Sequence, residues 1–235
     1  MIKNIFKESL ELYNDYMSRT QPDYWEYYGF EKRRFQIESL IKSINHNFNF
    51  EKLITLETGV SSDPRDGIFG LFLGFATEKT NGLMFGVDIN EERIEKSKFL
   101  FKEIIPDLNY LTYNNDSIKF LETTEIIPNL VHLDSWDLDI KNPFPCALHG
   151  WREFIAIESK MPSGSIIIVD DNYINGTWVD WHYSNGTVER ITIQYPIIGK
   201  GANIYHYVLN DSSKWKLIGD HYHIHDNIKI IIQKQ

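Results

Sequence analysis

The chain has 235 residues, of which 42% are hydrophobic and 14% aromatic, and its formal net charge is -9. This length and composition are sufficient for one packed domain and exclude a disordered chain. The acidic balance lacks the basic footprint of a nucleic-acid binding protein, although a local basic patch and tRNA modification stay open.

The single cysteine, Cys146, excludes a disulfide framework and a thiolate metal cluster. The first residues alternate charged and apolar side chains, without the apolar core of a signal peptide. No apolar run approaches the roughly 20 residues that span a bilayer. We therefore expect a cytoplasmic protein with no membrane partner. Both a monomer and a homo-oligomer stay open.

The spacing of Phe6, Leu10, Tyr13 and Met17 predicts a first amphipathic helix, and a second helix is expected over 31–44. After these, short apolar runs alternate with helical stretches. Strands are predicted at 52–59, 82–89, 108–116, 129–135 and 163–171. Helices are predicted at 66–79, 90–105 with Asn90 as N-cap, 117–124 and 146–161. This alternation favours right-handed βαβ units and a parallel sheet covered on both faces.

The end of the chain has a different pattern. An Asn-Gly pair at 185–186 between alternating runs predicts an inserted hairpin within 177–195. Residues 215–234 predict two closing strands that pair antiparallel. We therefore expect a doubly wound, mostly parallel seven-stranded α/β sheet with an antiparallel closing strand. The expected organisation is an N-terminal helical cap over 1–50 and one α/β domain over 51–235 that carries an insertion at about 173–199.

Ligands of open α/β sheets bind outside the carboxyl ends of the strands. Acidic residues follow five successive predicted strands here: Glu57, Asp88, Asp116, Asp134 and the pair Asp170 and Asp171. One pocket lined with carboxylates is the simplest interpretation. The loop GVSSDPRDG lacks the G-x-G-x-x-G spacing of a dinucleotide site, and carboxylates would repel a pyrophosphate. The pocket suits a ligand with hydroxyls and cationic groups, such as S-adenosylmethionine.

The segments ITLETGV, GVDIN, NNDSIKFL, VHLDSWD and IIIVDDN together resemble the class I S-adenosylmethionine-dependent methyltransferases, over about residues 51–235. The chain is most similar to the small metal-dependent O-methyltransferases and to related enzymes that modify sugars and antibiotics. The resemblance implies a Rossmann-like methyltransferase fold, in which 51–235 is the catalytic domain and the insertion at about 173–199 is the acceptor lid. It also implies methyl transfer to a hydroxyl of a small molecule, such as a sugar, a polyketide or a similar alcohol. The net charge of -9, rather than the resemblance, argues against a nucleic-acid partner.

This resemblance implies cofactor contacts for Glu57, Gly59, Ser61, Ser62, Asp88, Ile89, Asp116, Ser117, Asp134 and Trp136. Asp88 would accept hydrogen bonds from both ribose hydroxyls, and Asp116 with Ser117 would flank the adenine.

Structural alternatives stay open for several of these residues. Gly59 is also explained by a tight turn, and Asp116 by an N-cap of the following helix. Ser61 and Ser62 are also typical of an ordinary loop. Trp136 is also explained as a large side chain that packs in the core, as a core anchor.

The resemblance further assigns one divalent cation, usually Mg²⁺, to Asp134, Asp170 and Asp171. Hard oxygen ligands suit Mg²⁺, which would hold the acceptor and lower the pKa of its hydroxyl. A shift by one residue would make Asp171 and Asn172 the working pair. Without a metal, the acids are solvated, or Asp171 caps the next segment.

The candidate catalytic residues are Asp134, Asp137, His182 and Lys200. Catechol-modifying relatives have a lysine base three residues after the metal aspartate, where this sequence has Asp137, which favours a different alcohol. His182 lies in the predicted hairpin, and Lys200 resembles a glycine-flanked lysine of related sequences. His149 on the predicted helix at 146–161 is a further candidate for proton transfer, but packing or capping is the favoured role. The alternating histidines of the last segment are expected on an edge strand rather than at a metal: His221, His223 and His225.

Two other functions stay open. One is a hydroxylase-like tailoring protein on the same fold, and the other is a non-catalytic partner subunit that binds S-adenosylmethionine. The intact acids Asp134, Asp170 and Asp171 argue against the partner subunit. A dehydrogenase that uses NAD is least favoured, because the glycine fingerprint is absent.

Overall fold

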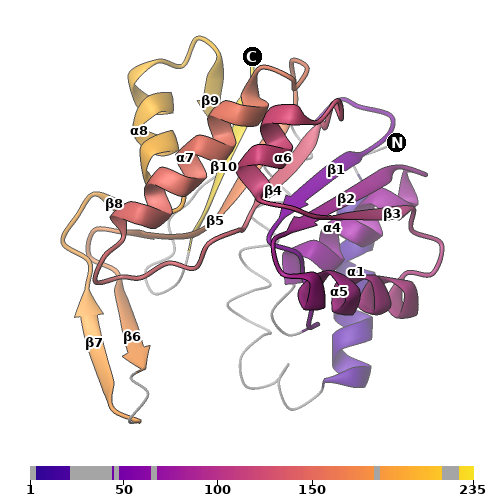
Figure 1. Cartoon of the computed structure of the whole chain (residues 1–235), viewed down its shortest axis with the longest axis horizontal. Coiled ribbons are helices and arrows are strands. Elements are labelled where there is room, and N and C mark those ends of the chain that lie inside the picture. The colour runs from indigo at the N-terminus through magenta and orange to yellow at the C-terminus, as the bar shows by residue number, and fades with distance from the viewer. Residues whose placement is uncertain (1–3, 22–43, 45–47, 65–67, 183–185, 219–227) are drawn as a thin grey trace.

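The structure is a computed structural model that describes residues 4–21, 44, 48–64, 68–182, 186–218 and 228–235. Its centre is an eight-stranded sheet between two layers of helices (Figure 1). Several predicted features lie outside the described residues: most of the helix at 31–44, Asn185 of the turn, and the histidines His221, His223 and His225.

Seven strands of the sheet follow one another in the order β3-β2-β1-β4-β5-β10-β9. Their bounds are β1 (Ile54–Thr58), β2 (Leu83–Asp88), β3 (Tyr110–Asn114), β4 (Leu130–Leu133), β5 (Ile166–Ile174), β9 (Trp215–Leu217) and β10 (Ile228–Lys234). The first five are parallel, whereas β10 pairs antiparallel with both β5 and β9. The predicted parallel sheet with an antiparallel closing strand is confirmed. The strand order reverses between β1 and β4, which is where such sheets bind ligands.

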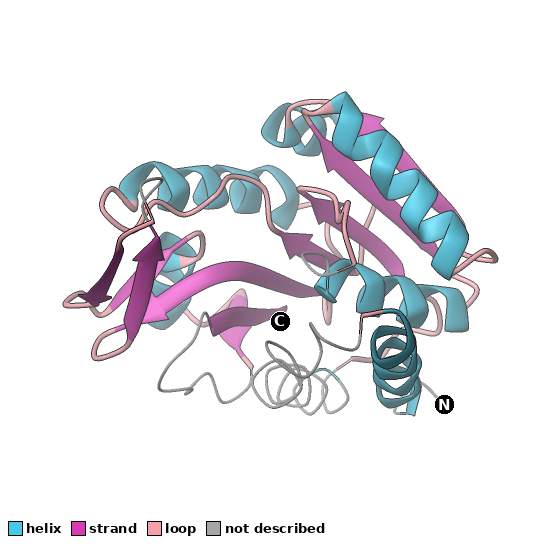
Figure 2. Cartoon of the chain, turned by 90° about the horizontal axis from the view of Figure 1, so that it is seen from below, coloured by secondary structure: helices cyan, strands magenta, loops and turns pink. Residues whose placement is uncertain are grey.

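Helices cover both faces of the sheet (Figure 2). They are α1 (Ile5–Thr20), α4 (Ile68–Lys79), α5 (Glu91–Ile104), α6 (Ser117–Thr123), α7 (Phe144–Glu158) and α8 (Ala202–Asn210). The core under α1, α4 and α5 includes Ile166 and Ile168, and the core under α6, α7 and α8 includes Ile167 and Val169. The continuous apolar run of β5 therefore fills two cores, because alternate residues face opposite sides.

Helix starts place two polar residues beside the carboxyl ends of strands. Asn90 caps α5, and its Oδ1 accepts from the backbone N–H of Glu92 at 2.9 Å and of Arg93 at 3.3 Å. Asp116 caps α6, and its Oδ1 accepts from the N–H of Lys119 at 2.9 Å. The N-cap prediction for Asn90 is confirmed, and the structural explanation of Asp116 also holds.

The sheet differs from the prediction beyond Val169. A short strand, β8 (Ile197–Gly199), was not predicted, and it pairs antiparallel with β5 from Asn172 to Ile174. The predicted strand end at residue 171 is therefore wrong, since β5 runs on to Ile174. Pairing with β4 nevertheless stops at Val169, so the following acids still lie at the edge where the parallel strands end.

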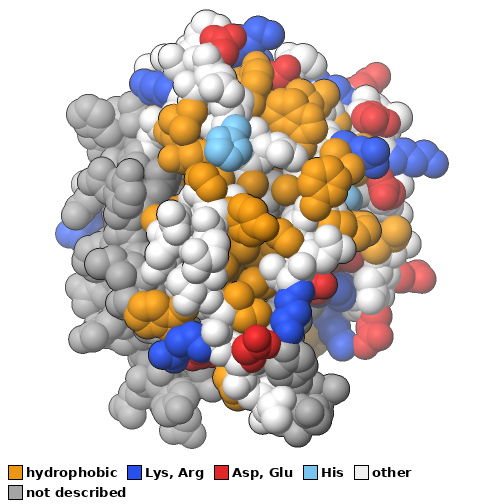
Figure 3. Space-filling view, turned by 90° about the vertical axis from the view of Figure 1, so that its left-hand side faces the viewer, with side chains coloured by type: hydrophobic (Ala, Val, Ile, Leu, Met, Phe, Trp, Pro, Cys, Tyr) orange, Lys and Arg blue, Asp and Glu red, His pale blue; other side chains and the backbone are white. Residues whose placement is uncertain are grey.

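The inserted segment forms a separate two-stranded hairpin, β6 (Trp178–His182) with β7 (Val188–Thr192), beyond the far end of β5 (Figure 1). Lys141 Nζ lies 3.0 Å from Glu189 Oε2 and ties the hairpin to the loop after β4. Figure 3 shows this side of the molecule, with hydrophobic side chains gathered at its centre. No helix among the described residues is long and apolar enough to cross a membrane.

The lone cysteine is expected to be unreactive in the folded protein. Cys146 on α7 is 1% exposed, and burial raises the pKa of its thiol to about 12. Thiolate is the reactive form, so we expect the native protein at pH 8 to react with dithionitrobenzoate at least ~100-fold more slowly than the unfolded chain. Absorbance at 412 nm would measure both rates. A native rate equal to that in guanidinium would contradict the buried position.

Candidate functional site

A cavity of about 320 Å³ opens at the carboxyl ends of β1 to β4. Its lining contains seven of the ten predicted cofactor residues: Gly59, Asp88, Ile89, Asp116, Ser117, Asp134 and Trp136. Asp137, Arg93, Ser135 and His149 line the same space. The volume lies near the lower end of the range that holds small ligands, roughly 300–1,000 Å³.

Gly59 lets two strand ends approach each other at the floor of this cavity. Its φ is +75°, and a Cβ there would lie 2.4 Å from the backbone oxygen of Asp134. Its N–H donates to the carbonyl of Val87 at 2.9 Å. The tight-turn explanation of Gly59 therefore holds, and the missing side chain leaves room for a ligand above the turn.

Asp88 ends β2 and is anchored from three sides. Its Oδ1 accepts from the N–H of Asn90 at 2.8 Å, and its Oδ2 accepts from the N–H of Val60 at 3.2 Å. Arg93 Nε lies 3.3 Å from Oδ2. A carboxylate has about four acceptor positions, and the two N–H groups use two of them, so this fixed group can still accept two hydrogen bonds from a ligand in the cavity.

Two exposed apolar side chains flank the cavity. Ile89 is 74% exposed and Trp136 is 56% exposed. The ring centroid of Trp136 lies 5.1 Å from that of His149, and the backbone at Trp136 turns with φ +68°. Trp136 is therefore not a core anchor, and its free face is available to a planar group.

A polar network closes the cavity on the α7 side. Ser135 Oγ donates to Glu153 Oε1 at 2.6 Å, and His149 Nε2 lies 2.8 Å from the same oxygen Oγ and 3.2 Å from Ser117 Oγ. The single hydroxyl hydrogen of Ser135 is used toward Glu153, so the contact with His149 requires a proton on Nε2. Packing or capping was the favoured role for His149, and the structure places its side chain in the cavity wall.

Three predicted cofactor residues do not line the cavity. Glu57 is fully buried, and its carboxylate accepts from the N–H of Ser61 at 3.3 Å and from the Oγ of Ser61 at 3.2 Å. Its Oε1 also lies 3.1 Å from His132 Nδ1. Glu57 and Ser61 hold the loop after β1, and Ser62 follows on the same loop, half-buried.

Asp134 and Asp171 share one buried ammonium. Lys200 Nζ lies 2.5 Å from Asp134 Oδ1, 3.2 Å from the backbone oxygen of Asp134 and 2.8 Å from Asp171 Oδ2. Burial alone would lower the pKa of Lys200, but the two carboxylates outweigh it and raise that pKa above its usual range. Lys200 therefore stays charged, and the structure does not support it as a proton acceptor.

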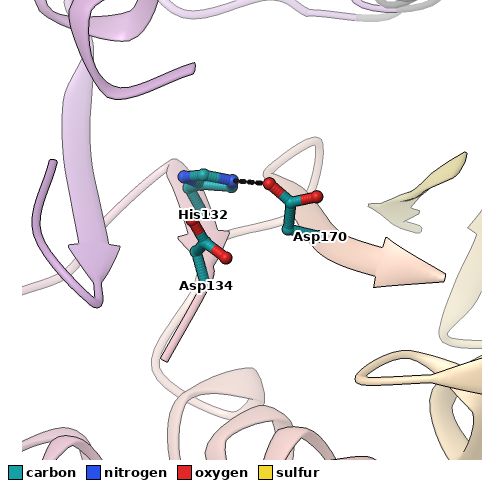
Figure 4. Close-up of side chains that lie close together, drawn as sticks. All are labelled: His132, Asp134 and Asp170. Atoms are coloured by element: carbon teal, nitrogen blue, oxygen red, sulfur yellow. Dashed lines mark ion pairs between the residues drawn. The ribbon is translucent and has the colours of Figure 1, made fainter. Parts of the chain in front are cut away.

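Asp170 is paired on the other side of the cluster. It forms an ion pair with Lys229 at a register shift of β10, and its Oδ2 lies 3.6 Å from His132 Nε2. Figure 4 shows His132 of β4 facing Asp170 of β5, with Asp134, the residue that follows β4, beside His132. Ligand atoms of these three residues lie within 4.8 Å of one another, and Asp171 does not belong to this group.

The predicted magnesium ligands therefore do not fit as a set, because each of the three carboxylates already faces a lysine ammonium. The alternative register fails as well. Asn172 is fully buried, and its Nδ2 donates to the carbonyls of Val169 and Asp170. Its Oδ1 accepts from the N–H of Gly201 at 2.7 Å. Asn172 is thus a structural link between β5 and the Lys200 loop.

The remaining catalytic candidates lie in different places. Asp134 and Asp137 both line the cavity, beside Trp136. His182 ends β6 in the hairpin, and its side chain is not among the described ones.

Sequence reasoning missed His132 and Arg93. His132 lies two residues before Asp134, so the alternation of side chains along β4 puts both on one face. This two-residue spacing could have indicated that His132 belongs to the site. Arg93 lies in the first turn of α5, where the capped helix start points back toward Asp88.

No family model and no curated protein matches this sequence. Solved structures with similar folds include an S-adenosylmethionine-dependent methyltransferase from Clostridium acetobutylicum, with 11% identity, a TM-score of 0.52, and 94% of this chain and 96% of that chain covered. An rRNA methylase from Streptococcus thermophilus has 8% identity, a TM-score of 0.52, and coverage of 87% and 98%. A Streptococcus mutans protein described as a methyltransferase, in complex with S-adenosylhomocysteine, has 8% identity, a TM-score of 0.54, and coverage of 88% and 100%. The chain has the Rossmann-like fold of class I methyltransferases.

Proposed function

We propose that the cavity binds S-adenosylmethionine and that the chain transfers its methyl group to a hydroxyl oxygen of a small molecule. One observation carries the proposal: the anchored carboxylate of Asp88 and the exposed side chains of Ile89 and Trp136 line one cavity at the switch point of the sheet. Proteins of the same fold include a methyltransferase that uses this cofactor and one that holds its demethylated product, which supports the proposal.

The charge of the cavity also favours this ligand over a dinucleotide. Four carboxylates line it, and the basic side chains in its wall are Arg93 and His149. The carboxylates are Asp88, Asp116, Asp134 and Asp137. A net negative wall attracts a sulfonium and an amine and repels a pyrophosphate.

Each wall of the cavity has a role in this proposal. Asp88 would accept from the ribose hydroxyls, while Ile89 and Trp136 would hold the two faces of the adenine. Ser117 and His149 lie where the edge of the base would come. Once bound, the sulfonium supplies an activated methyl group.

We place the acceptor on the side of Trp136 that continues toward the hairpin. The contact between Lys141 and Glu189 brings β7 beside the loop that carries Asp137. The exposed apolar side chains Phe144 and Val188 would suit an organic acceptor. Asp137 would take the proton from the acceptor hydroxyl, and the insertion over 173–199 would act as the lid.

Calorimetric titration with S-adenosylhomocysteine tests the proposal, with NAD⁺ as the comparison ligand. We expect micromolar binding of the first and no heat from the second. No binding of S-adenosylhomocysteine, with or without Mg²⁺, would overturn the proposed cofactor.

The acceptor needs a separate experiment. Transfer of a radiolabelled methyl group would be followed in parallel with sugar and polyketide alcohols and with rRNA. Label in an alcohol is expected. Label only in the RNA would replace the small-molecule acceptor by a nucleic acid, which the net charge of -9 disfavours.

A further inference from the structure

Asp134, Asp170 and Asp171 form an acidic cluster at the ends of β4 and β5. We propose that Lys200 is the permanent cation of this cluster: its ammonium occupies the position between Asp134 and Asp171 where metal-dependent relatives would hold a divalent ion. The inference does not depend on the proposed methyl transfer, because metal binding can be measured without cofactor or acceptor.

The first support is that the Lys200 ammonium has as many hydrogen-bond acceptors around it as it has hydrogens. A lysine ammonium has three hydrogens, and Lys200 Nζ has three acceptors within 3.2 Å. Two are oxygens of Asp134 and one is Oδ2 of Asp171. The side chain is 2% exposed, so these oxygens replace the water that a charged group would otherwise need.

The second support is the backbone that delivers the lysine. Lys200 follows β8, whose pairing with β5 sets Gly199 beside Asn172. Gly199 has φ +118°, and a Cβ there would lie 2.0 Å from the backbone oxygen of Asp171. On the other side, a Cβ at Gly150 of α7 would lie 2.3 Å from the backbone oxygen of Lys200. Glycines on both sides thus permit a close approach that fixes where the lysine side chain starts.

The third support is charge. A divalent ion between Asp134 and Asp171 would lie against a buried ammonium that cannot move into water without losing all three acceptors. Asp170 offers no vacant alternative, because Lys229 pairs with it. Lys200 is therefore a positioning residue: it holds the carboxylate of Asp134, which lines the cavity, in one orientation.

Titration with Mn²⁺ followed by electron paramagnetic resonance tests the inference in the full-length protein. The wild-type protein is expected to show no stoichiometric Mn²⁺ site. Lys200→Met keeps the length and apolar stem of the side chain but leaves two carboxylates without their cation. We expect this variant to bind one Mn²⁺ at least about tenfold more tightly than the wild type. Adding Asp171→Asn to it should abolish the gain.

Lys160→Met is the matched control. Lys160 Nζ also has three acceptors, the carbonyl oxygens of Leu121, Glu122 and Thr124 at 2.6 to 2.9 Å, but none of them is a carboxylate. Its removal should leave Mn²⁺ binding as weak as in the wild type. One tight Mn²⁺ site in the wild-type protein, or no gain in a folded Lys200→Met variant, would overturn the inference.

A second measurement keeps the test decisive if Lys200→Met does not fold. Proton–nitrogen spectra of protein labelled at lysine Nζ should show a slowly exchanging ammonium signal for Lys200, identified in the Lys160→Met background. The signal should be unchanged by excess Mg²⁺. A shift or loss of this signal on adding Mg²⁺ would contradict a resident lysine.

Discussion

Asp88→Ala is expected to weaken the binding of S-adenosylhomocysteine by at least ~100-fold, as measured by calorimetry. The proposed complex has two ribose hydroxyls that donate to this carboxylate, and hydrogen bonds to a charged group each contribute about 1.5–3 kcal/mol. The loss of both is therefore worth at least about 3 kcal/mol, which corresponds to this change in affinity.

Two variants separate lost recognition from lost structure. Asp88 also accepts from the N–H groups of Val60 and Asn90, so alanine at this position loosens both loops. Asp88→Asn keeps one acceptor in the same place and should bind with intermediate affinity. Glu92→Ala removes an exposed acid that pairs with Lys96 on the outer side of α5, and it should bind like the wild type. A folded Asp88→Ala variant with unchanged affinity would rule out this carboxylate as the ribose ligand.

The parts of the fold that local patterns determine could be predicted. The run Ile166 to Val169 indicates a strand buried on both sides, and all four residues are fully buried. Asn90 before two glutamates indicates a helix start, and it caps α5. The strand order places Asp88 and Asp134 at one edge, which is why the carboxylate-lined pocket could be anticipated from the sequence.

The partners of the acids could not be predicted, because they depend on contacts between distant segments. Lys200 lies 66 positions from Asp134 in the chain and reaches it through a four-carbon side chain whose end point no local pattern specifies. The strand that positions it, β8, has three residues, too few for a period-two pattern. The resemblance to metal-dependent enzymes led to Mg²⁺ for the same reason: the acids match a motif, and that motif does not include the lysines that pair with them, which lie far away in the sequence.

Gly59→Ala is expected to lower the free energy of unfolding by about 2–4 kcal/mol, through a strained backbone and a steric clash together. The residue has φ +75°, and the new Cβ would lie 2.4 Å from the oxygen of Asp134 and 2.9 Å from the nitrogen of Ser135, so the ends of β1 and β4 would have to separate. A thermal melt should show a midpoint lower by roughly 5–12 °C.

Gly176→Ala isolates the contribution of the clash. Its φ is +84°, close to that of Gly59, but no atom lies within 4 Å of the Cβ that it would carry. This variant should lose only about 1 kcal/mol, the typical cost of a left-handed backbone for alanine. Because the clash at Gly59 moves Asp134, Gly59→Ala should also lose affinity for S-adenosylhomocysteine, whereas Gly176→Ala should keep it. Equal destabilisation of the two variants would mean that the ends of β1 and β4 are not packed as closely as the structure places them. The position of Asp134 at the floor of the cavity would then be wrong.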